Sequence, residues 1–163
     1  MNINNFLLKD KNKALLIESG NGFSQDKLLN TIAQALNNGT KIIQFYDKKI
    51  TDKENVELAL KIRQLCSIFN ALFIINSRAD IAQIVNADGL CLFKDDITFQ
   101  QAKSFFHKDI IFAIHAITIE DAINAIKNNI DYICVDLNTK QFLNCNIDGL
   151  NEIKIIELDR QII

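Results

Sequence analysis

The chain has 163 residues, of which 48% are hydrophobic and 23% charged, and its net charge at pH 7 is −2. This length can bury one substantial core, so we expect a single domain over residues 1–163. The small net charge and the lack of basic runs argue against a nucleic-acid binder, and no apolar run approaches the roughly 18 residues that span a membrane. The chain begins without the long apolar stretch of a secretory signal, so we predict a cytoplasmic protein.

The first half of the chain alternates short apolar runs with segments of helical periodicity. In chain order these predict a strand at Ala14–Ile17, a helix at Lys27–Asn37, a strand at Lys41–Phe45 and a helix at Asp52–Phe69. Ser24 or Asp26 can cap the first helix, and Thr51 with Glu54 can form a capping box for the second. Apolar runs without polar alternation are typical of strands buried on both faces of a parallel sheet.

The segment from Ala71 to Asp96 has the clearest strand–helix–strand pattern. Leu72–Ile75 and Leu90–Phe93 are apolar runs, and Ala79–Val85 between them can place small side chains on one face of a short helix. Polar residues follow each run: Asn76, Ser77 and Arg78 after the first, and Lys94, Asp95 and Asp96 after the second. Ligands of α/β barrels bind at the carboxyl ends of the strands, so we expect a site there.

The second half of the chain continues the same alternation. It predicts, in order, a short helix capped by Thr98, a strand at Ile110–Ile114, a helix from Thr118 to Lys127 and a strand at Tyr132–Val135. The last segment, Gly149–Leu158, is predicted as an amphipathic helix, although Lys154–Leu158 could also form a strand.

The six predicted strands begin about 24 residues apart, which is close to the spacing in a (β/α)₈ barrel. The chain is about two units too short for eight, so we predict a TIM-barrel-like α/β fold that is incomplete, with about six βα units. An open arc would leave unpaired edges on its first and last strands. Either the segment Gly149–Ile163 or a second chain could cover them. We predict a homodimer with this apolar tail at or near the interface.

Two motifs resemble those of the thiamin phosphate synthases and the related thiazole tautomerases (TenI-like). Residues 44–48, QFYDK, are similar to the family's Gln-x-Arg-x-Lys motif, and residues 74–96, IINSRADIAQIVNADGLCLFKDD, resemble the family's block from Ile-Ile-Asn-Asp-Arg to Asp-Asp. The resemblance runs from about residue 14 to residue 149. It implies a transferase of thiamin biosynthesis, which joins a pyrimidine diphosphate to a thiazole phosphate with the help of Mg²⁺.

The resemblance also implies which residues bind the phosphorylated substrate. They are Gln44, Tyr46, Lys48, Asn76 and, if Thr139–Lys140 matches the Thr-Lys of the family's sixth loop, Lys140. Tyr46 stands where the family has an arginine, so a permanent cation and a two-pronged phosphate contact are lost. Lys48 can still hold one phosphate, although a solvated basic loop needs no such role.

Two further positions are weaker candidates. Asp96 matches one of the family's two Mg²⁺-binding aspartates, but Ser77 replaces the other, and a neutral hydroxyl lowers the affinity for this cation. The alternative for Asp96 is a solvated loop that caps the next helix. His115 aligns with a family serine at the end of the fifth strand, where catalytic residues occur in barrels, so it is a weak catalytic candidate. A polar residue at a strand end also occurs without chemistry.

Two functional hypotheses follow from this pattern. The first is an enzyme of thiamin biosynthesis with impaired synthase activity, because the arginine, the aspartate and the family's last two phosphate-binding strands have no counterparts here. Losing one charged transition-state contact costs about 2.7–4 kcal/mol. The second is a catalytically inactive, barrel-derived binding or interaction module. Turnover with both substrates and Mg²⁺ distinguishes the two.

Overall fold

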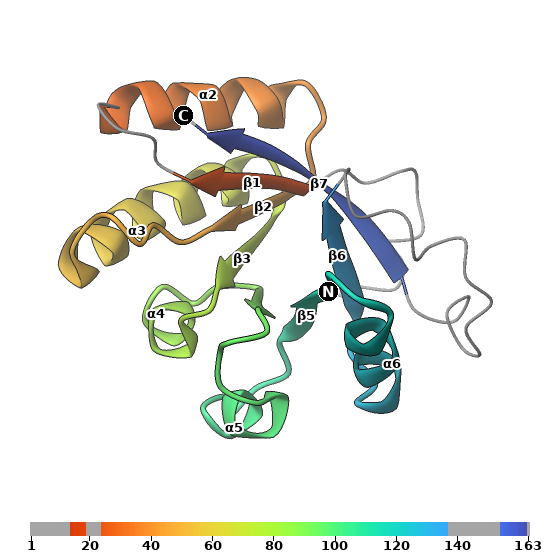
Figure 1. Ribbon diagram of the computed structural model, residues 1–163. Helices are drawn as coiled ribbons and strands as arrows, with labels where there is room; N and C mark the ends of the chain where they lie inside the picture. The colour runs from red at the N-terminus through yellow and green to blue at the C-terminus, as the bar shows by residue number, and fades with distance from the viewer. Residues whose placement is uncertain (1–13, 19–23, 137–153, 163) are drawn as a thin grey trace.

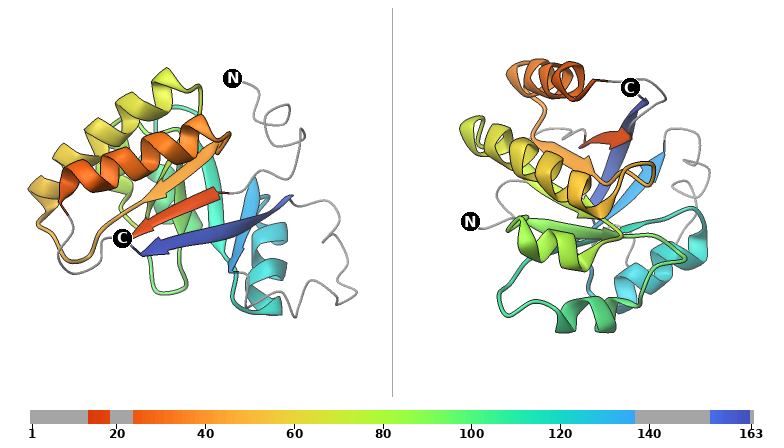
Figure 2. Two further views of the ribbon diagram at one scale, coloured as in Figure 1. Left: turned by 90° about the horizontal axis from the view of Figure 1, so that it is seen from above. Right: turned by 90° about the vertical axis from the view of Figure 1, so that its left-hand side faces the viewer.

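The computed structural model describes residues 14–18, 24–136 and 154–162, and within these ranges seven parallel strands close into a barrel in chain order. The strands are β1 (Ala14–Glu18), β2 (Ile42–Phe45), β3 (Leu72–Asn76), β4 (Gly89–Leu92), β5 (Ile111–His115), β6 (Tyr132–Asp136) and β7 (Lys154–Ile162). The described helices, α2 (Gln25–Asn37), α3 (Asp52–Ile68), α4 (Ala79–Ile84), α5 (Phe99–Ser104) and α6 (Ile119–Lys127), lie outside the strands (Figures 1 and 2). The predicted TIM-barrel-like fold is confirmed. No helix in these ranges is long and apolar enough to cross a membrane.

The helices begin at the capping residues that the sequence indicates. Ser24 caps α2, and its side chain accepts a hydrogen bond from the backbone N–H of Lys27. At α3, the Thr51 hydroxyl accepts from the N–H of Glu54, and the Glu54 carboxylate accepts from the N–H of Thr51 at 2.8 Å. The same reciprocal box opens α5 and α6. Each box satisfies two backbone donors that a helix start leaves without partners, which fixes where the helix begins.

The helices also end in a shared way. Asn70, Asn86 and Asn129 lie two residues beyond the ends of α3, α4 and α6, and each has a φ of 51°. Gly39, with a φ of 97°, occupies the same place after α2. Asparagine tolerates this left-handed conformation better than most residues, so a chain with only five glycines can still turn α2, α3, α4 and α6 toward the next strand.

The core has two layers, one inside the barrel and one between the strands and the helices. Alternate strand residues fill the barrel interior: Ala14, Leu16, Ile42, Leu72, Ile74, Cys91, Ile111, Ala113, Tyr132 and Cys134. The intervening strand residues pack outward against buried helix residues such as Leu28, Ile32 and Ile62. Strands that are buried on both faces explain why the sequence shows continuous apolar runs without alternation.

The seventh strand corrects the sequence prediction for the end of the chain. β7 pairs in parallel with β6 on one side and with β1 on the other. A helix over Gly149–Leu158 is therefore wrong from Lys154 onward, and the alternative strand is present and extends to Ile162. The two edges that hydrogen-bond to β7 belong to β1 and β6, which lie more than a hundred residues apart in the chain. The periodicity of the β7 segment alone cannot reveal these partners.

The edges of a six-stranded arc do not stay open: β7, which belongs to the segment Gly149–Ile163, occupies the gap between β1 and β6, so the first of the two expected ways to cover them is confirmed. All six predicted strands are present, and the barrel described here has fewer strands than the eight of a complete TIM barrel. The homodimer stays a prediction, but unpaired edges of β1 and β6 no longer support it.

Candidate polar site at the carboxyl ends of the strands

The residues singled out by the sequence lie where β2 to β5 end. Gln44 and Asn76 are buried in the barrel, Tyr46 is half-buried just after β2, and Lys48 is exposed in the following loop. These four come from the neighbouring strands β2 and β3. The structure therefore places four of the five predicted substrate-binding residues in or directly after two neighbouring strands. The fifth, Lys140, lies outside the residues that the structure describes.

Gln44 is anchored inside the barrel by residues of β6. Its amide Nε2 donates to the hydroxyl of Tyr132 at 3.2 Å and to the sulfur of Cys134 at 3.0 Å. The Cys91 thiol lies 3.9 Å from the same sulfur. Burial raises the pKa of Tyr132, so its phenol is neutral. The amide oxygen of Gln44 is buried and has no hydrogen-bond partner among the described residues.

Asn76 ends β3 with a second buried oxygen of this kind. Its side chain is 4% exposed, and its Oδ1 has no hydrogen-bond partner in the described part of the chain. Ser77, the next residue, has a φ of 64°, which is uncommon for a residue other than glycine. Backbone of this kind costs about 1–3 kcal/mol and tends to cluster at binding sites. Two adjacent strands thus carry buried acceptors near the barrel mouth for which the described residues supply no donor.

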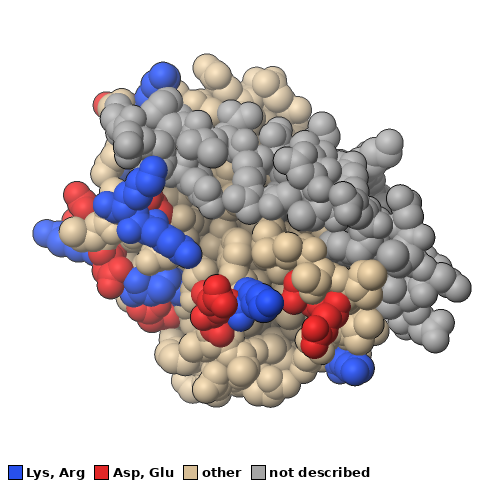
Figure 3. Space-filling view, in the orientation of Figure 1, with Lys and Arg blue, Asp and Glu red and all other residues tan. Residues whose placement is uncertain are grey.

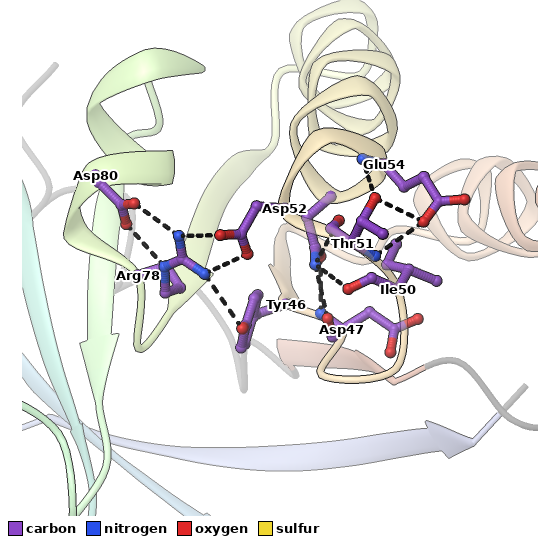
Figure 4. A network of polar contacts seen from close by, with 9 residues as sticks. Tyr46, Asp47, Ile50, Thr51, Asp52, Glu54, Arg78 and Asp80 are labelled. Atoms are coloured by element: carbon purple, nitrogen blue, oxygen red, sulfur yellow. Dashed lines mark hydrogen bonds and ion pairs between the residues drawn. The ribbon is translucent and has the colours of Figure 1, made fainter.

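The Arg78 guanidinium joins the loops after β2 and β3 (Figure 4). It donates to both oxygens of Asp52, at 2.6 and 3.1 Å, and to both oxygens of Asp80, at 2.9 and 2.7 Å. A further hydrogen bond of 3.4 Å reaches the hydroxyl of Tyr46, whose ring centroid lies 5.7 Å from the guanidinium carbon. Hydrogen bonds from Arg78 lower the pKa of both carboxyl groups, so both are ionised at neutral pH.

The loop that carries Lys48 is held in place by a buried asparagine. The side chain of Asn55 accepts from the N–H of Asp47 at 3.0 Å and donates to the Asp47 carbonyl at 2.7 Å. The Asp47 carboxylate in turn accepts from the N–H of Lys49 at 2.8 Å. The backbone is therefore fixed, while the lysine side chains at positions 48 and 49 are exposed. Basic and acidic side chains are interspersed on the face shown in Figure 3.

His115 and Asp96 line a different feature of the molecule. Both border a pocket of about 470 Å³ between α5 and α6, which Lys94 and Thr118 also line. His115 is 3% exposed and stacks on Phe93, with ring centroids 4.7 Å apart. Asp96 accepts a hydrogen bond from the N–H of Phe93 at 2.7 Å. Tyr46 and Asn76 do not line this pocket.

Some residues of the site could not be recognised from the sequence. Tyr132 and Cys134 support Gln44 from a strand almost ninety residues away, and a buried strand residue gives no pattern that reveals its partner. Asn55 is a polar residue at a buried helix position, which is the one local sign of its role. Asp52 and Asp80 both open helices, where acidic residues are common for other reasons.

Comparison with known proteins identifies the family. The family model described as thiamine monophosphate synthase matches residues 15–140. The thiamine-phosphate synthase of Prochlorococcus marinus (strain AS9601) is 36% identical over 142 residues, which cover 85% of this chain and 40% of that protein. The thiamine-phosphate synthase of Methanobrevibacter smithii is 32% identical over 122 residues, or 75% of this chain and 58% of that protein. The chain thus spans only about half the length of such relatives.

A solved structure supports the same fold. The thiamine phosphate pyrophosphorylase from Pyrococcus furiosus superposes with a TM-score of 0.73 over 93% of this chain and 76% of that one, at 23% sequence identity. A putative dihydrodipicolinate synthetase from Pseudomonas aeruginosa superposes with a TM-score of 0.57 at 10% identity. These likenesses show the fold alone. The family model, in contrast, covers most of the chain and includes both motifs at the barrel mouth, so the chain belongs to the thiamine monophosphate synthase family.

Proposed function

We propose that this chain binds a phosphorylated pyrimidine or thiazole of thiamin biosynthesis at the carboxyl ends of its strands, with impaired synthase activity. The observation that carries the proposal is the pair of buried acceptors, Gln44 Oε1 and Asn76 Oδ1. Buried polar atoms usually have partners, and an unmet acceptor costs about 1–3 kcal/mol. An aminopyrimidine has N–H donors that meet such acceptors, and a phosphate could then reach the exposed Lys48.

The impairment follows from the charges around this mouth. Tyr46 is neutral where the family has arginine, and Ser77 is neutral where the family has aspartate. Arg78 cannot supply the missing cation, because Asp52 and Asp80 already hold its guanidinium. Departure of a diphosphate builds negative charge that cations must stabilise. The remaining lysines favour binding over turnover.

We include Mg²⁺ in this proposal as a weakly held partner of the ligand. Among the described residues there is no group of three or more His, Cys, Asp or Glu side chains that could hold a metal ion. Asp96, in the loop after β4, is a carboxylate of the type that Mg²⁺ prefers, and such ions commonly take their other ligands from phosphates and water. Bound there, Mg²⁺ would neutralise charge on the leaving diphosphate. We expect Lys140 to contribute a further cation.

A second candidate is a catalytically inactive binding or interaction module, which the neutralised Arg78 favours.

For either function we propose a cytoplasmic location, because Cys66, Cys91 and Cys134 are free thiols, as is usual in a reducing compartment. A homodimer is also proposed. Its support is the exposure of the large apolar side chains of Ile68 and Ile84.

Calorimetry with hydroxymethylpyrimidine diphosphate and with thiazole phosphate, each with and without Mg²⁺, tests the proposal. We expect weak, salt-sensitive binding that is reduced about tenfold or more in Lys48→Ala, since a hydrogen bond to a charged group contributes about 1.5–3 kcal/mol, and in Asn76→Ala, since a buried ligand donor left without a partner costs about 1–3 kcal/mol. Lys127→Ala, in the last turn of α6, is the matched control and should bind normally. Absence of heat with either ligand at millimolar concentration would refute the binding site.

A coupled assay with both substrates separates the two candidates. We expect turnover far below the roughly 1–10³ s⁻¹ of ordinary enzymes, and no turnover if the chain is an inactive module. Turnover within that range would contradict the impairment.

A further inference from the structure

The guanidinium of Arg78 has no donor left for a ligand. Its five N–H groups make five hydrogen bonds: two to Asp52, two to Asp80 and one to Tyr46. A ligand phosphate would have to displace a bidentate carboxylate to reach it. Because all five N–H donors of Arg78 are already used, this arginine does not bind the phosphate itself.

The two carboxylates differ in what they connect. Asp80 lies two residues from Arg78 in the same segment, so this pair is local to the loop after β3. Asp52 is the first residue of α3, directly after the loop that carries Tyr46 and Lys48. The Asp52–Arg78 pair is therefore the contact that joins the loop after β2 to the loop after β3 (Figure 4).

Tyr46, in the loop after β2, contacts the same guanidinium. Its hydroxyl accepts from Arg78 at 3.4 Å, and the guanidinium carbon lies 5.7 Å from the ring centroid. Asn76, at the end of β3, is two residues before Arg78 in the chain. The Arg78 side chain therefore connects the end of β3 to the loop after β2.

We propose that Arg78 is a positioning residue. Through Asp52 it fixes the distance between the Tyr46–Lys48 segment, which follows β2, and the Asn76 end of β3, and so sets the geometry in which a phosphorylated heterocycle contacts both places. The ligand in this inference rests on the proposed function. The connection between the two loops through Arg78 and Asp52 does not depend on that function. It also predicts that the Asp52 pair matters more than the Asp80 pair, although both involve the same guanidinium.

The experiment compares Asp52→Asn with Asp80→Asn, which are isosteric changes that each remove one negative charge near the mouth. Charge alone would make both variants bind an anion slightly more tightly. A positioning role predicts the opposite sign for Asp52→Asn: about tenfold weaker binding of hydroxymethylpyrimidine diphosphate, with Asp80→Asn within about twofold of the wild type. Asp52→Glu, which keeps the charge, should recover part of the loss. Arg63→Gln, which breaks the Arg63–Asp88 pair away from the mouth, is the control and should bind normally.

A second readout needs no ligand. The chain has two tyrosines and no tryptophan, so its intrinsic fluorescence comes from Tyr46 and the fully buried Tyr132. Acrylamide quenching should rise in Asp52→Asn, because Tyr46 loses its fixed neighbour, and should stay unchanged in Asp80→Asn. If Asp52→Asn binds as well as Asp80→Asn and is quenched to the same extent, the positioning role is wrong. If the wild type binds nothing while the quenching difference is present, the proposed function fails and the positioning role stands.

Discussion

Gly89, the first residue of β4, shows how little space the barrel interior leaves. A Cβ atom at this position would lie 2.6 Å from the carbonyl oxygen of Ile111 and 2.8 Å from side-chain atoms of Ile111 and Ile74. Both of these residues belong to strands, β5 and β3, that pair in parallel with β4. One missing methyl group therefore lets β3, β4 and β5 approach one another.

Gly89→Ala should lower the free energy of unfolding by about 1–3 kcal/mol, the usual cost of forcing an extra carbon into a packed core. Urea denaturation followed by circular dichroism measures the change. The matched control is Gly39→Asn, because no atom lies within 4 Å of a Cβ at that site and asparagine adopts a positive φ at three other helix ends. Equal stabilities of the two variants would contradict the packing argument.

The thiol of Cys66 is predicted to be chemically inert in the folded protein. Burial is the main cause that raises the pKa of this thiol to about 12, so only about one molecule in 10⁴ carries the reactive thiolate at pH 8. Iodoacetamide followed by peptide mass spectrometry should leave Cys66 unmodified in native protein and modify it after urea unfolding. Rapid labelling of native protein would show that the α3 side of the core opens.

A reciprocal capping box begins three of the described helices, α3, α5 and α6. Thr51 and Glu54 form a reciprocal box at α3, and Thr98 with Gln101 forms the same box at α5. Carboxylate and amide side chains thus serve the same capping role in one molecule, so the role of charge at a cap can be tested by exchanging them.

Thr51→Ala should cost about 1 kcal/mol of stability, as is typical for the loss of a helix cap. The measurement is thermal or urea unfolding at neutral pH. Ser67→Ala is a suitable control, because Ser67 is exposed near the other end of α3 and its hydroxyl bonds only to the Arg63 carbonyl among the described contacts. A loss in the control as large as that in Thr51→Ala would contradict a specific capping effect.

The cap of α3 should also make stability depend on pH. The Thr51 N–H lowers the pKa of Glu54 below its ordinary value, so its stabilisation is present above about pH 4.3 and is lost as the pH falls through the lower folded-state pKa. Unfolding curves between pH 6 and 3 should therefore show a steeper loss for the wild type than for Glu54→Gln, which caps without titrating. Parallel losses in the two proteins would exclude this carboxylate as a source of the dependence.

At the scale of the whole molecule, closure depends on β7. This strand pairs with five residues of β1 and five of β6, so it supplies hydrogen bonds to both ends of the sheet. Without it, the apolar strands β1 and β6 would each expose an edge, and such edges promote aggregation.

A chain truncated after Gly149 is expected to be insoluble or to melt without a cooperative transition. Calorimetry and light scattering on the purified product test this, and a chain lacking only Ile163, which follows β7, is the control. A soluble truncated chain with a cooperative transition would contradict the closing role of β7.

The sequence by itself determined much of this protein. Apolar runs located the first six strands, and the capping residues Ser24, Thr51, Thr98 and Thr118 marked where helices begin. These features depend on residues within one turn of helix or one strand, so local chemistry specifies them. The two family motifs likewise placed Gln44, Tyr46, Lys48 and Asn76 at the ends of β2 and β3.

Only the tertiary structure decided the contacts between distant segments. The strand β7 depends on edges offered by β1 and β6, whereas its own sequence is also compatible with a helix. The bonds of Gln44 to Tyr132 and of Arg78 to Asp52 join segments 88 and 26 residues apart. Such hydrogen bonds and the closure of the barrel depend on the distance between two groups in the folded chain. The local order of residues does not encode the distance between groups that are far apart in the sequence.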